Sequence, residues 1–316
     1  MPGPRRRPEV SEETLQRPPA GRVERLAPGL RRVIAPNPSP MTHWGTNSYI
    51  VGEGDVAVID PGPADPAHMR ALLAALKKGE RVSHIIVTHA HLDHSPLARP
   101  LAEATGAPVI AFGDARAGRS AVMERLARAG LAGGGEGVDS AFAPDVVVAD
   151  GERIAGAGWE LEVIHTPGHF GNHLSLAWGE AVFTGDHVMG WASSLVSPPD
   201  GDLAQFMESC ARLAARKARI FYPGHGAPIS DPAARLDWLI AHRRSRGRQI
   251  AEALAEAPDT ALGLARRIYS DVPEALLPAA SRNVFAHLVE MFQKNEVEAE
   301  PDLSPGARFR LIARQR

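Results

Sequence analysis

The most constraining feature of this 316-residue chain is one short run, Thr88-His89-Ala90-His91-Leu92-Asp93-His94. It continues residues 83–88, whose length and apolar content predict a buried strand that delivers the chain to His89. Two histidines two positions apart in a tight loop can aim their ring nitrogens at one cation. Asp93 and His94, next along the chain, can turn toward a second cation. The run therefore predicts a metal site at the end of a strand.

Three further segments place a His or an Asp directly after a short apolar run. They are Thr166-Pro167-Gly168-His169, Thr184-Gly185-Asp186-His187 and Pro223-Gly224-His225-Gly226. In the Pro-Gly-His turns, Pro fixes φ and Gly permits a sharp bend that aims the next histidine inward. We expect His169 to complete the first site, His225 to complete the second, and Asp186 to give one carboxylate oxygen to each ion. A single histidine is more often structural, but this joint occurrence predicts two Zn²⁺ ions, with iron or manganese as alternative metals.

Other polar residues near these turns are expected outside the ligand set. Asp60 ends the apolar run 55–60, just before a Pro-Gly-Pro turn. His173 and His187 each follow a ligand turn, and they are candidates either for supporting the ligands or transferring protons, or for ordinary structural hydrogen bonds. Trp44, Trp191 and Tyr222 lie beside these segments in the sequence and are candidates for lining a substrate groove.

The rest of the chain divides at about Pro228. Before it, short apolar runs alternate with helical patterns. Helices are expected at 67–78 and 96–104, strands at 108–112, 146–148, 159–165, 173–178, 181–184 and 218–222, and a glycine-rich surface loop at 130–137. After it, helical patterns cover 232–256, 261–269 and 274–294, and extended pieces follow near 297 and at 308–312. Helices followed by a two-strand ribbon resemble a winged helix.

Three parts are therefore expected: a flexible tail at 1–20, rich in Pro and charge, a main domain at 21–230 and a helical, winged-helix-like domain at 231–316. The single cysteine, Cys210, excludes an internal disulfide and suits a reducing cytosol, and its apolar surroundings predict a packed helix residue. No apolar run reaches transmembrane length, so we expect a cytoplasmic protein without membrane association. A formal charge of −2 gives no general sign of a nucleic-acid binder.

The run at 88–94, together with His169, Asp186 and His225 in this order, resembles the metallo-beta-lactamase superfamily, over residues 60–225. The resemblance implies an α+β fold, an αββα sandwich with metals in a groove at one sheet edge. It also implies the roles of the residues, with Asp60 supporting the ligand loop. The first zinc would take His89, His91 and His169, the second Asp93, His94 and His225, and Asp186 would bridge them.

Within that superfamily the chain most resembles the lactamase-beta-2-like group, known for a single-strand-specific endoribonuclease. The segments that carry this likeness are 45–52, 59–62, 184–190, 197–202, 268–269, 280–284 and 287–288. True lactamases are disfavoured because many place a cysteine in the second site. Glyoxalase II has similar ligands but a helical C-terminal region shaped for glutathione. Phe170 stands where the group usually has Thr after Thr-Pro-Gly-His, which predicts a changed groove wall.

The expected function is hydrolysis. A metal-bound hydroxide would attack an ester, a thioester or a phosphodiester, the last including single-stranded RNA, with Asp93 and Asp186 as catalytic residues. A glyoxalase II-like thioesterase and a mononuclear iron persulfide dioxygenase are the alternatives, and a nucleic-acid-binding winged helix is a third. The basic run 242–248 is either a face for a phosphate backbone or a solvated helix face.

Overall fold

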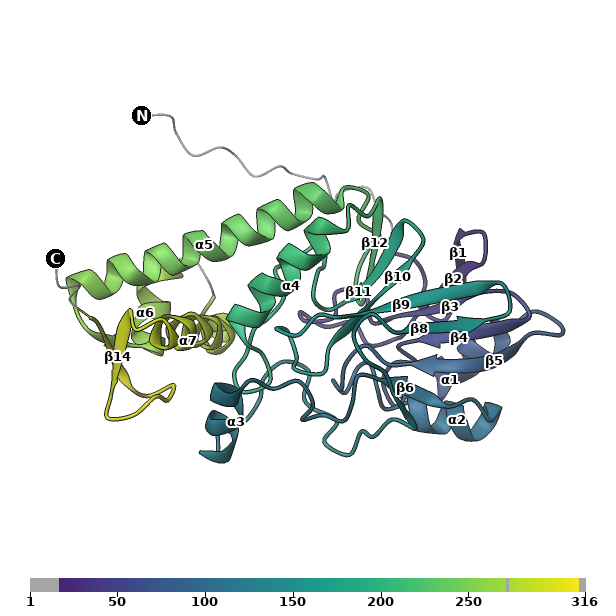
Figure 1. Cartoon of the computed structure of the whole chain (residues 1–316), viewed down its shortest axis with the longest axis horizontal. Coiled ribbons are helices and arrows are strands. Elements are labelled where there is room, and N and C mark those ends of the chain that lie inside the picture. The colour runs from purple at the N-terminus through teal and green to yellow at the C-terminus, as the bar shows by residue number, and fades with distance from the viewer. Residues whose placement is uncertain (1–16, 271–272, 313–316) are drawn as a thin grey trace.

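A computed structural model describes residues 17–270 and 273–312, so the expected tail lies, up to residue 16, outside the described residues. Two sheets face each other in it (Figure 1). The first sheet runs, in this order, β1 (Val23–Ala27), β2 (Leu30–Ile34), β3 (Asn47–Val51), β4 (Asp55–Ile59), β5 (Arg81–Ile86), β6 (Val109–Ala111) and β7 (Val146–Val147). The second runs β12 (Ile220–Pro223), β11 (Ala181–Gly185), β10 (Leu174–Trp178), β9 (Trp159–His165) and β8 (Arg153–Gly156).

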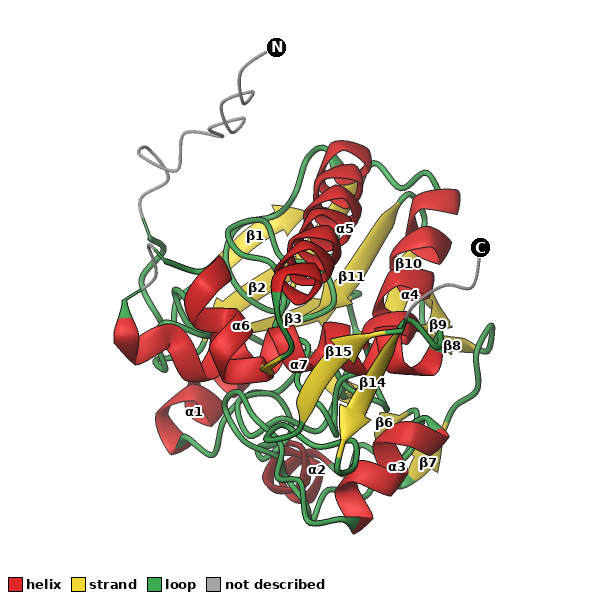
Figure 2. Ribbon diagram, turned by 90° about the vertical axis from the view of Figure 1, so that its left-hand side faces the viewer, coloured by secondary structure: helices red, strands yellow, loops and turns green. Residues whose placement is uncertain are grey.

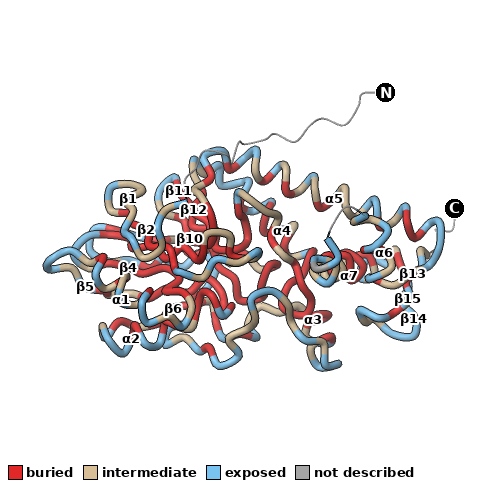
Figure 3. Tube along the Cα trace, turned by 180° about the vertical axis from the view of Figure 1, so that it is seen from behind, coloured by how far each residue is buried: buried red, intermediate tan, exposed pale blue. Residues whose placement is uncertain are grey.

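The alternation of side chains along β4 shows how the layers are stacked. Val56 and Val58 point into a core shared with helices α1 (Pro66–Ala74) and α2 (Ala98–Thr105). Ala57 and Ile59, which point the other way, join the core between the two sheets. Figure 3 shows the strands of the two sheets as the most continuously buried part of the chain.

The outer face of the second sheet is covered by α4 (Leu203–Ala215) and the first half of α5 (Pro232–Glu256). Phe206 and Cys210 of α4 and Leu236 of α5 pack against Val182 of β11. The order of layers is therefore helix, sheet, sheet, helix, and the expected αββα sandwich is confirmed. Cys210 is fully buried, as expected for a packed helix residue, and burial raises the pKa of its thiol to about 12.

The C-terminal part combines helices with a small sheet (Figure 2). Its elements are the second half of α5, α6 (Ala261–Ile268), the short 3-10 helix η2 (Glu274–Leu276), α7 (Leu277–Gln293), and strands β13 (Asp259–Thr260), β15 (Arg308–Leu311) and β14 (Val297–Glu300), paired in that order. The expected winged-helix-like fold is confirmed. Because α5 packs on both the sandwich and this core, the boundary expected near residue 230 stays a prediction.

Two features of the C-terminal core differ from expectation. Helix α3 (Ala121–Arg128), which the sequence pattern did not predict, contributes Met123 and Leu126 to it. In the basic run, Arg243 is only 4% exposed and Arg246 lies over the ring of Tyr269 at 4.0 Å, so the run forms neither a continuous basic face nor a fully solvated one. Both interpretations of this run are therefore wrong for Arg243.

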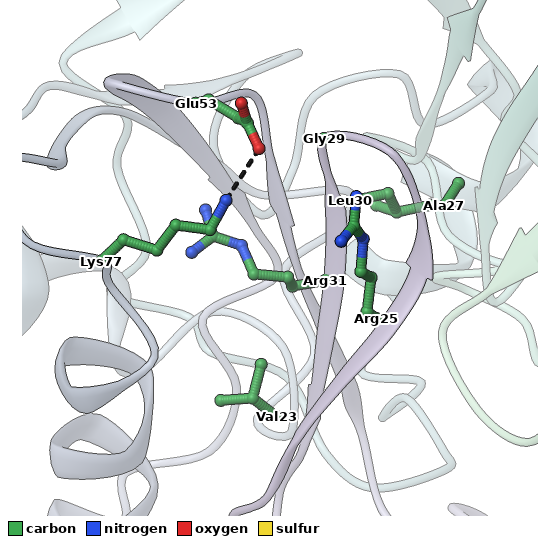
Figure 4. Close-up of a pocket in the computed structure, with 8 residues that line it drawn as sticks. All are labelled: Val23, Arg25, Ala27, Gly29, Leu30, Arg31, Glu53 and Lys77. Carbon is green, nitrogen blue, oxygen red and sulfur yellow. Dashed lines mark hydrogen bonds and ion pairs between the residues drawn. The ribbon is translucent and has the colours of Figure 1, made fainter.

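A hollow of about 140 Å³ lies beside the β1–β2 hairpin, where Lys77 pairs with Glu53 at 2.7 Å (Figure 4). Both of these side chains are well exposed, and exposed pairs of this kind contribute little stability. None of the helices in the described part of the chain combines the length and the apolar character needed to cross a bilayer.

Candidate metal centre

Four strand ends bring the predicted residues to one edge of the sandwich. β5 leads to the run 88–94, β9 to His169, β11 to Asp186 and β12 to His225. β4 runs parallel to β5, and β11 runs parallel to β12, so their carboxyl ends lie at the same edge. All seven predicted ligands meet there in three overlapping groups whose donor atoms lie within 4.8 Å of one another. The groups are His89, His91 and His169; His89, His94 and Asp186; and Asp93, His94 and His225.

The distances divide the donors into two sets with Asp186 between them. His91 Nδ1 lies 2.9 Å from His89 Nε2 and 3.1 Å from His169 Nε2. In the other set, Nε2 of His225 lies 3.3 Å from that of His94 and 3.1 Å from Asp93 Oδ2. The carboxylate of Asp186 reaches both sets. Its oxygens lie 3.2 Å from His225 Nε2, 3.4 Å from His94 Nε2 and 3.8 Å from His169 Nε2.

The outer ring nitrogens show which nitrogen of each histidine carries its proton. His169 Nδ1 donates to the carbonyl oxygen of Leu195 at 2.7 Å, and His225 Nδ1 donates to that of Gly45 at 3.2 Å. His94 Nδ1 donates to Asp60 Oδ2 at 2.9 Å. These contacts fix the outer proton of each ring, so each Nε2 offers its lone pair to the cluster whenever the histidine is neutral.

The outer nitrogen of His89, Nδ1, also has an acceptor, which is the hydroxyl group of Thr88. Thr88 Oγ1 donates its own hydrogen to Asp60 Oδ2 at 2.8 Å, so it accepts from His89 Nδ1 at 3.0 Å. The lone pair of His89 Nε2 therefore also faces inward. Lone pairs of buried nitrogens that converge in this way repel one another unless a cation lies between them.

The donor set fits two cations. Around a tetrahedral Zn²⁺ with bonds of about 2.0–2.1 Å, two ligand atoms lie roughly 3.3–3.4 Å apart. The separations within each set, 2.9–3.3 Å, are close to that value. Asp93 Oδ1 and Asp186 Oδ1 are buried and have no hydrogen-bond partner within the described residues, so both retain capacity for an ion or for water.

The carboxylates make the two sets electrostatically different. Burial, together with the neighbouring His169, lowers the pKa of His91 to about 3. Burial also acts to lower the pKa of His225, but Asp186 and Asp93 outweigh it and raise that pKa to about 10. The set that contains Asp93 and His225 therefore demands positive charge, from protons or from a metal ion.

Asp60 supports this arrangement from behind. Its backbone has φ +50°, a strained conformation for a residue other than glycine, and its side chain is buried. Its Oδ1 accepts from the backbone amide of Thr88 at 2.7 Å, and its Oδ2 accepts from the Thr88 hydroxyl and from His94. One carboxylate thus fixes the start of the ligand loop and the orientation of His94.

The two other candidate supporting histidines lie in different surroundings. His173 Nδ1 contacts Thr166 Oγ1 at 2.9 Å, and its Nε2 accepts from the backbone amide of Asp186 at 3.2 Å. This bond places His173 directly behind Asp186. The His187 ring packs on Phe206, with centroids 4.4 Å apart, and its Nε2 lies 3.5 Å from Cys210 Sγ. Participation of these two histidines in the reaction stays a prediction.

The two Pro-Gly-His turns need glycine for different reasons. Gly168 has φ +137°, and a Cβ built there would lie 2.3 Å from the Cα of Phe206. A Cβ at Gly224 would instead lie 2.2 Å from Asp186 Oδ1, so the close approach of the chain to the carboxylate requires a missing side chain. Both glycines therefore set the position of a candidate ligand.

Gly168→Ala is expected to destabilise the fold by about 2–6 kcal/mol, because φ strain and overpacking against α4 add. It should also displace His169 and weaken metal binding. Thermal unfolding and metal content after dialysis would measure both effects. Gly158→Ala is the matched control, since Gly158 has φ +79° but open space at its Cβ position. Equal losses in the two variants would show that contact with Phe206 has no effect.

A narrow groove opens over the candidate ligands. Besides His91, Asp93, His169, Asp186 and His225, its lining consists of Met41, Gly135, Glu136, Met189 and Leu195. The glycine-rich stretch is a loop as expected, but part of it closes over the site, because a Cβ at Gly135 would lie 3.8 Å from His91 Cε1. Ser39 Oγ donates to Glu136 Oε1 at 2.8 Å and joins the two loops at the rim.

Two residues expected in the groove lie elsewhere. Phe170 is fully buried in the core under α1 and α2, with its ring centroid 4.8 Å from that of His91. Tyr222 is 5% exposed and belongs to the core between the sheets. Their expected roles in the groove wall are therefore wrong. Trp44 and Trp191 both stack on His43, at 5.0 and 4.8 Å, next to the turn that carries His225.

Comparison with known proteins gives matches over both parts of the chain. Residues 41–225 match the family model described as the metallo-beta-lactamase superfamily, and residues 260–304 match the beta-lactamase associated winged helix domain. A "Beta-lactamase-like protein 2 homolog" of Drosophila melanogaster is 30% identical over 287 residues, which cover 87% of this chain and 91% of that protein.

Two further relatives bear on fold and chemistry. An "Atrochrysone carboxyl ACP thioesterase" of Aspergillus fumigatus is 30% identical over 241 residues, covering 73% of this chain and 67% of that protein. The crystal structure of a metallo-beta-lactamase family protein from Thermus thermophilus superimposes with a TM-score of 0.72 at 26% identity. That alignment covers 91% of this chain and all of the other.

Proposed function

Because the chain belongs to the metallo-beta-lactamase superfamily and is a metal-dependent hydrolase with a His/Asp metal site, we propose that it is a zinc-dependent thioesterase for small acyl thioesters. The composition of the groove carries this proposal. Its walls beyond the candidate ligands are Met41, Gly135, Met189 and Leu195, with Glu136 as the one added charge among the described lining residues. Such walls suit an uncharged acyl chain and a sulfur atom.

The same composition argues against an RNA phosphodiester. Proteins that bind a nucleic-acid backbone neutralise its phosphates with Lys and Arg. Within the described residues, the lining of this groove contains neither, and Glu136 would repel a phosphate. The basic run of α5 does not form a continuous basic face, because Arg243 is buried. We therefore rank the thioester above single-stranded RNA.

A relative supports the choice of a thioester over an oxygen ester. The Aspergillus fumigatus protein named as an acyl carrier protein thioesterase has the same 30% identity as the Drosophila melanogaster relative, over 241 residues compared with 287. A thiolate is a good leaving group, so the reaction needs little assistance to the departing sulfur. That chemistry agrees with the described groove lining, in which no Lys or Tyr is present to protonate a leaving alkoxide.

Each group at the site has a role in this proposal. Two divalent cations, when bound, lower the pKa of a water molecule and polarise the substrate carbonyl. Asp186, between the two donor sets, orients the attacking water. Asp93 Oδ1, buried and without a hydrogen-bond partner in the described residues, accepts a proton from it. Met189 and Leu195 hold the acyl chain and exclude bulk water.

A panel of substrates tests the proposal. We expect kcat/KM to be highest for a short-chain acyl thioester of pantetheine, and at least about 100-fold lower for bis(p-nitrophenyl) phosphate, single-stranded RNA and a cephalosporin. S-lactoylglutathione tests the glyoxalase II-like alternative. Activity should disappear in His169→Ala. If the protein cleaved RNA, lost that cleavage in His169→Ala and did not hydrolyse thioesters, it would be an endoribonuclease and the proposal would fail.

The iron persulfide dioxygenase alternative predicts a different metal count. Since both donor sets are complete in the described residues, we expect two metal ions per chain after purification without added metal. Mass spectrometry of the same preparation measures this number. One iron per chain with oxygen uptake on glutathione persulfide would favour the dioxygenase.

A further inference from the structure

The segment 189–197, between β11 and α4, is held by side chains of the C-terminal helices. Arg235 of α5 donates to the carbonyl oxygens of Met189 and Ala192, each at 2.6 Å. Arg282 of α7 donates to Ser197 Oγ at 3.0 Å. Two more residues, Arg243 of α5 and Asn283 of α7, bind the middle of the segment. The segment therefore depends on α5 and α7, which lie side by side in Figure 1, for its conformation.

This segment forms part of the metal site and of the groove. It supplies the side chains of Met189 and Leu195 to the groove wall. The carbonyl oxygen of Leu195 also accepts the hydrogen bond from His169 Nδ1, at 2.7 Å. That bond selects the tautomer in which His169 Nε2 carries its lone pair toward the other donors.

Arg243 and Asn283 fix Leu195 from both neighbouring residues. Arg243 donates to the carbonyl oxygen of Ser194, and it also donates to Asn283 Oδ1 at 3.0 Å. Asn283 Oδ1 accepts in turn from the backbone amide of Val196 at 3.4 Å. The peptide groups on either side of Leu195 are thus bound to one connected pair of side chains.

Arg243 also backs the turn that carries His169. Its guanidinium group lies 5.2 Å from the ring centroid of Phe206, whose backbone packs against Gly168. Arg243 is 4% exposed, and it donates to two neutral groups, Asn283 Oδ1 and the Ser194 carbonyl oxygen. A buried guanidinium group is costly, so an apolar residue at this position would give a more stable helix packing if Arg243 had no other role.

We infer that Arg243 and Asn283 are positioning residues for the metal site: through the Leu195 carbonyl they hold His169 in its ligand geometry. The inference rests on His169 as a ligand of the proposed first site, and it does not depend on the thioester substrate. It gives the winged-helix-like domain a defined contribution to the site on the neighbouring sandwich. Removing either side chain frees the peptide groups flanking Leu195, and the His169 ring loses its fixed orientation.

The test measures Zn²⁺ affinity by competition with a chelator. In full-length His225→Ala, which lacks a donor of the second site, Asn283→Ala and Arg243→Met are expected to weaken Zn²⁺ binding about 10–100-fold, the range for residues that orient a ligand. Arg243→Lys should recover part of the loss by binding the Ser194 carbonyl. Arg244→Met, an exposed neighbour on the same helix, is the matched control and should leave affinity unchanged.

The reciprocal background separates positioning from general loosening. In His169→Ala, where Zn²⁺ binds the second set, Asn283→Ala should have no effect on affinity, because the residue through which it acts is missing. Equal weakening in both backgrounds, or no weakening in His225→Ala, would overturn the inference. If adding His169→Ala to the His225→Ala variant left Zn²⁺ affinity unchanged, the ligand assignment would fail, and the inference with it. None of these outcomes involves a substrate, so failure of the proposed thioesterase activity is seen separately.

Discussion

Asp186→Asn is expected to reduce kcat by more than the roughly 10–100-fold typical of residues that only support a metal ligand, and to lower metal content by about one ion per chain. The carboxylate of Asp186 reaches both donor sets, with oxygens 3.2 Å from His225 Nε2 and 3.8 Å from His169 Nε2. Although burial acts to raise it, the pKa of Asp186 is held well below its usual value by His225 and His94. The carboxylate is therefore charged at any working pH, and Asn removes a full negative charge.

The amide also has the wrong hydrogen-bonding groups. Its NH₂ group would face the inner nitrogens of His94 or His225, where a cation is expected to bind. Steady-state kinetics and metal analysis by mass spectrometry measure the two effects together. Glu180→Gln is the control, because this carboxylate is 74% exposed on the β10–β11 turn. An Asp186→Asn protein with full metal content and normal kcat would remove Asp186 from the site.

The sequence predicted the residues of the site because each follows a strand. Short apolar runs mark the strands of this sandwich, and the expected strand 159–165 coincides with β9. The expected helix 232–256 likewise coincides with α5. Parallel strands end at one edge, so His and Asp residues that follow them are brought together without any knowledge of long-range contacts. The αββα order of layers, by contrast, was expected from the resemblance to the superfamily and not from these runs.

The rest of the site depends on partners that a sequence pattern does not contain. His169 Nδ1 donates to the backbone carbonyl oxygen of Leu195. Every residue type has such a carbonyl, so no sequence pattern identifies this partner. Arg243 stands in a basic run, a pattern that predicts a surface position, but contacts with α7, with Phe206 of α4 and with the segment 189–197 bury it. Phe170 follows a ligand turn but points into the core, because the position of a residue in a tight turn does not determine the direction of its side chain. Helix α3 is short and owes its stability to packing on the distant C-terminal core.

Acidification is expected to release metal from the set of Asp93, His94 and His225 long before it affects the set of His89, His91 and His169. Without metal, the pKa of His225 is about 10, raised by Asp186 and Asp93 against the effect of burial. Burial acts to lower the pKa of His94 as well, but Asp93 and Asp186 raise it well above 6.5. Below these values a cation must displace protons, so its affinity falls as pH falls.

The other set should show almost no dependence on pH in this range, because its histidines are already neutral. Burial lowers the pKa of His91 to about 3, so a cation there competes with no proton at neutral pH. For each proton displaced, the second-set affinity should drop about tenfold per pH unit, or about 100-fold between pH 8 and pH 6, while the first-set affinity stays nearly constant.

Calorimetry measures the difference directly. Zn²⁺ is titrated at pH 7 into His169→Ala, which retains the second set, and into His225→Ala, which retains the first, in two buffers of different ionisation enthalpy. Binding to the second set should release at least about one proton per ion, and binding to the first close to none. Equal proton release in the two variants would contradict this prediction. It would mean that Asp93 and Asp186, although they lie next to His225, do not make the pKa values of the two sets of histidines different.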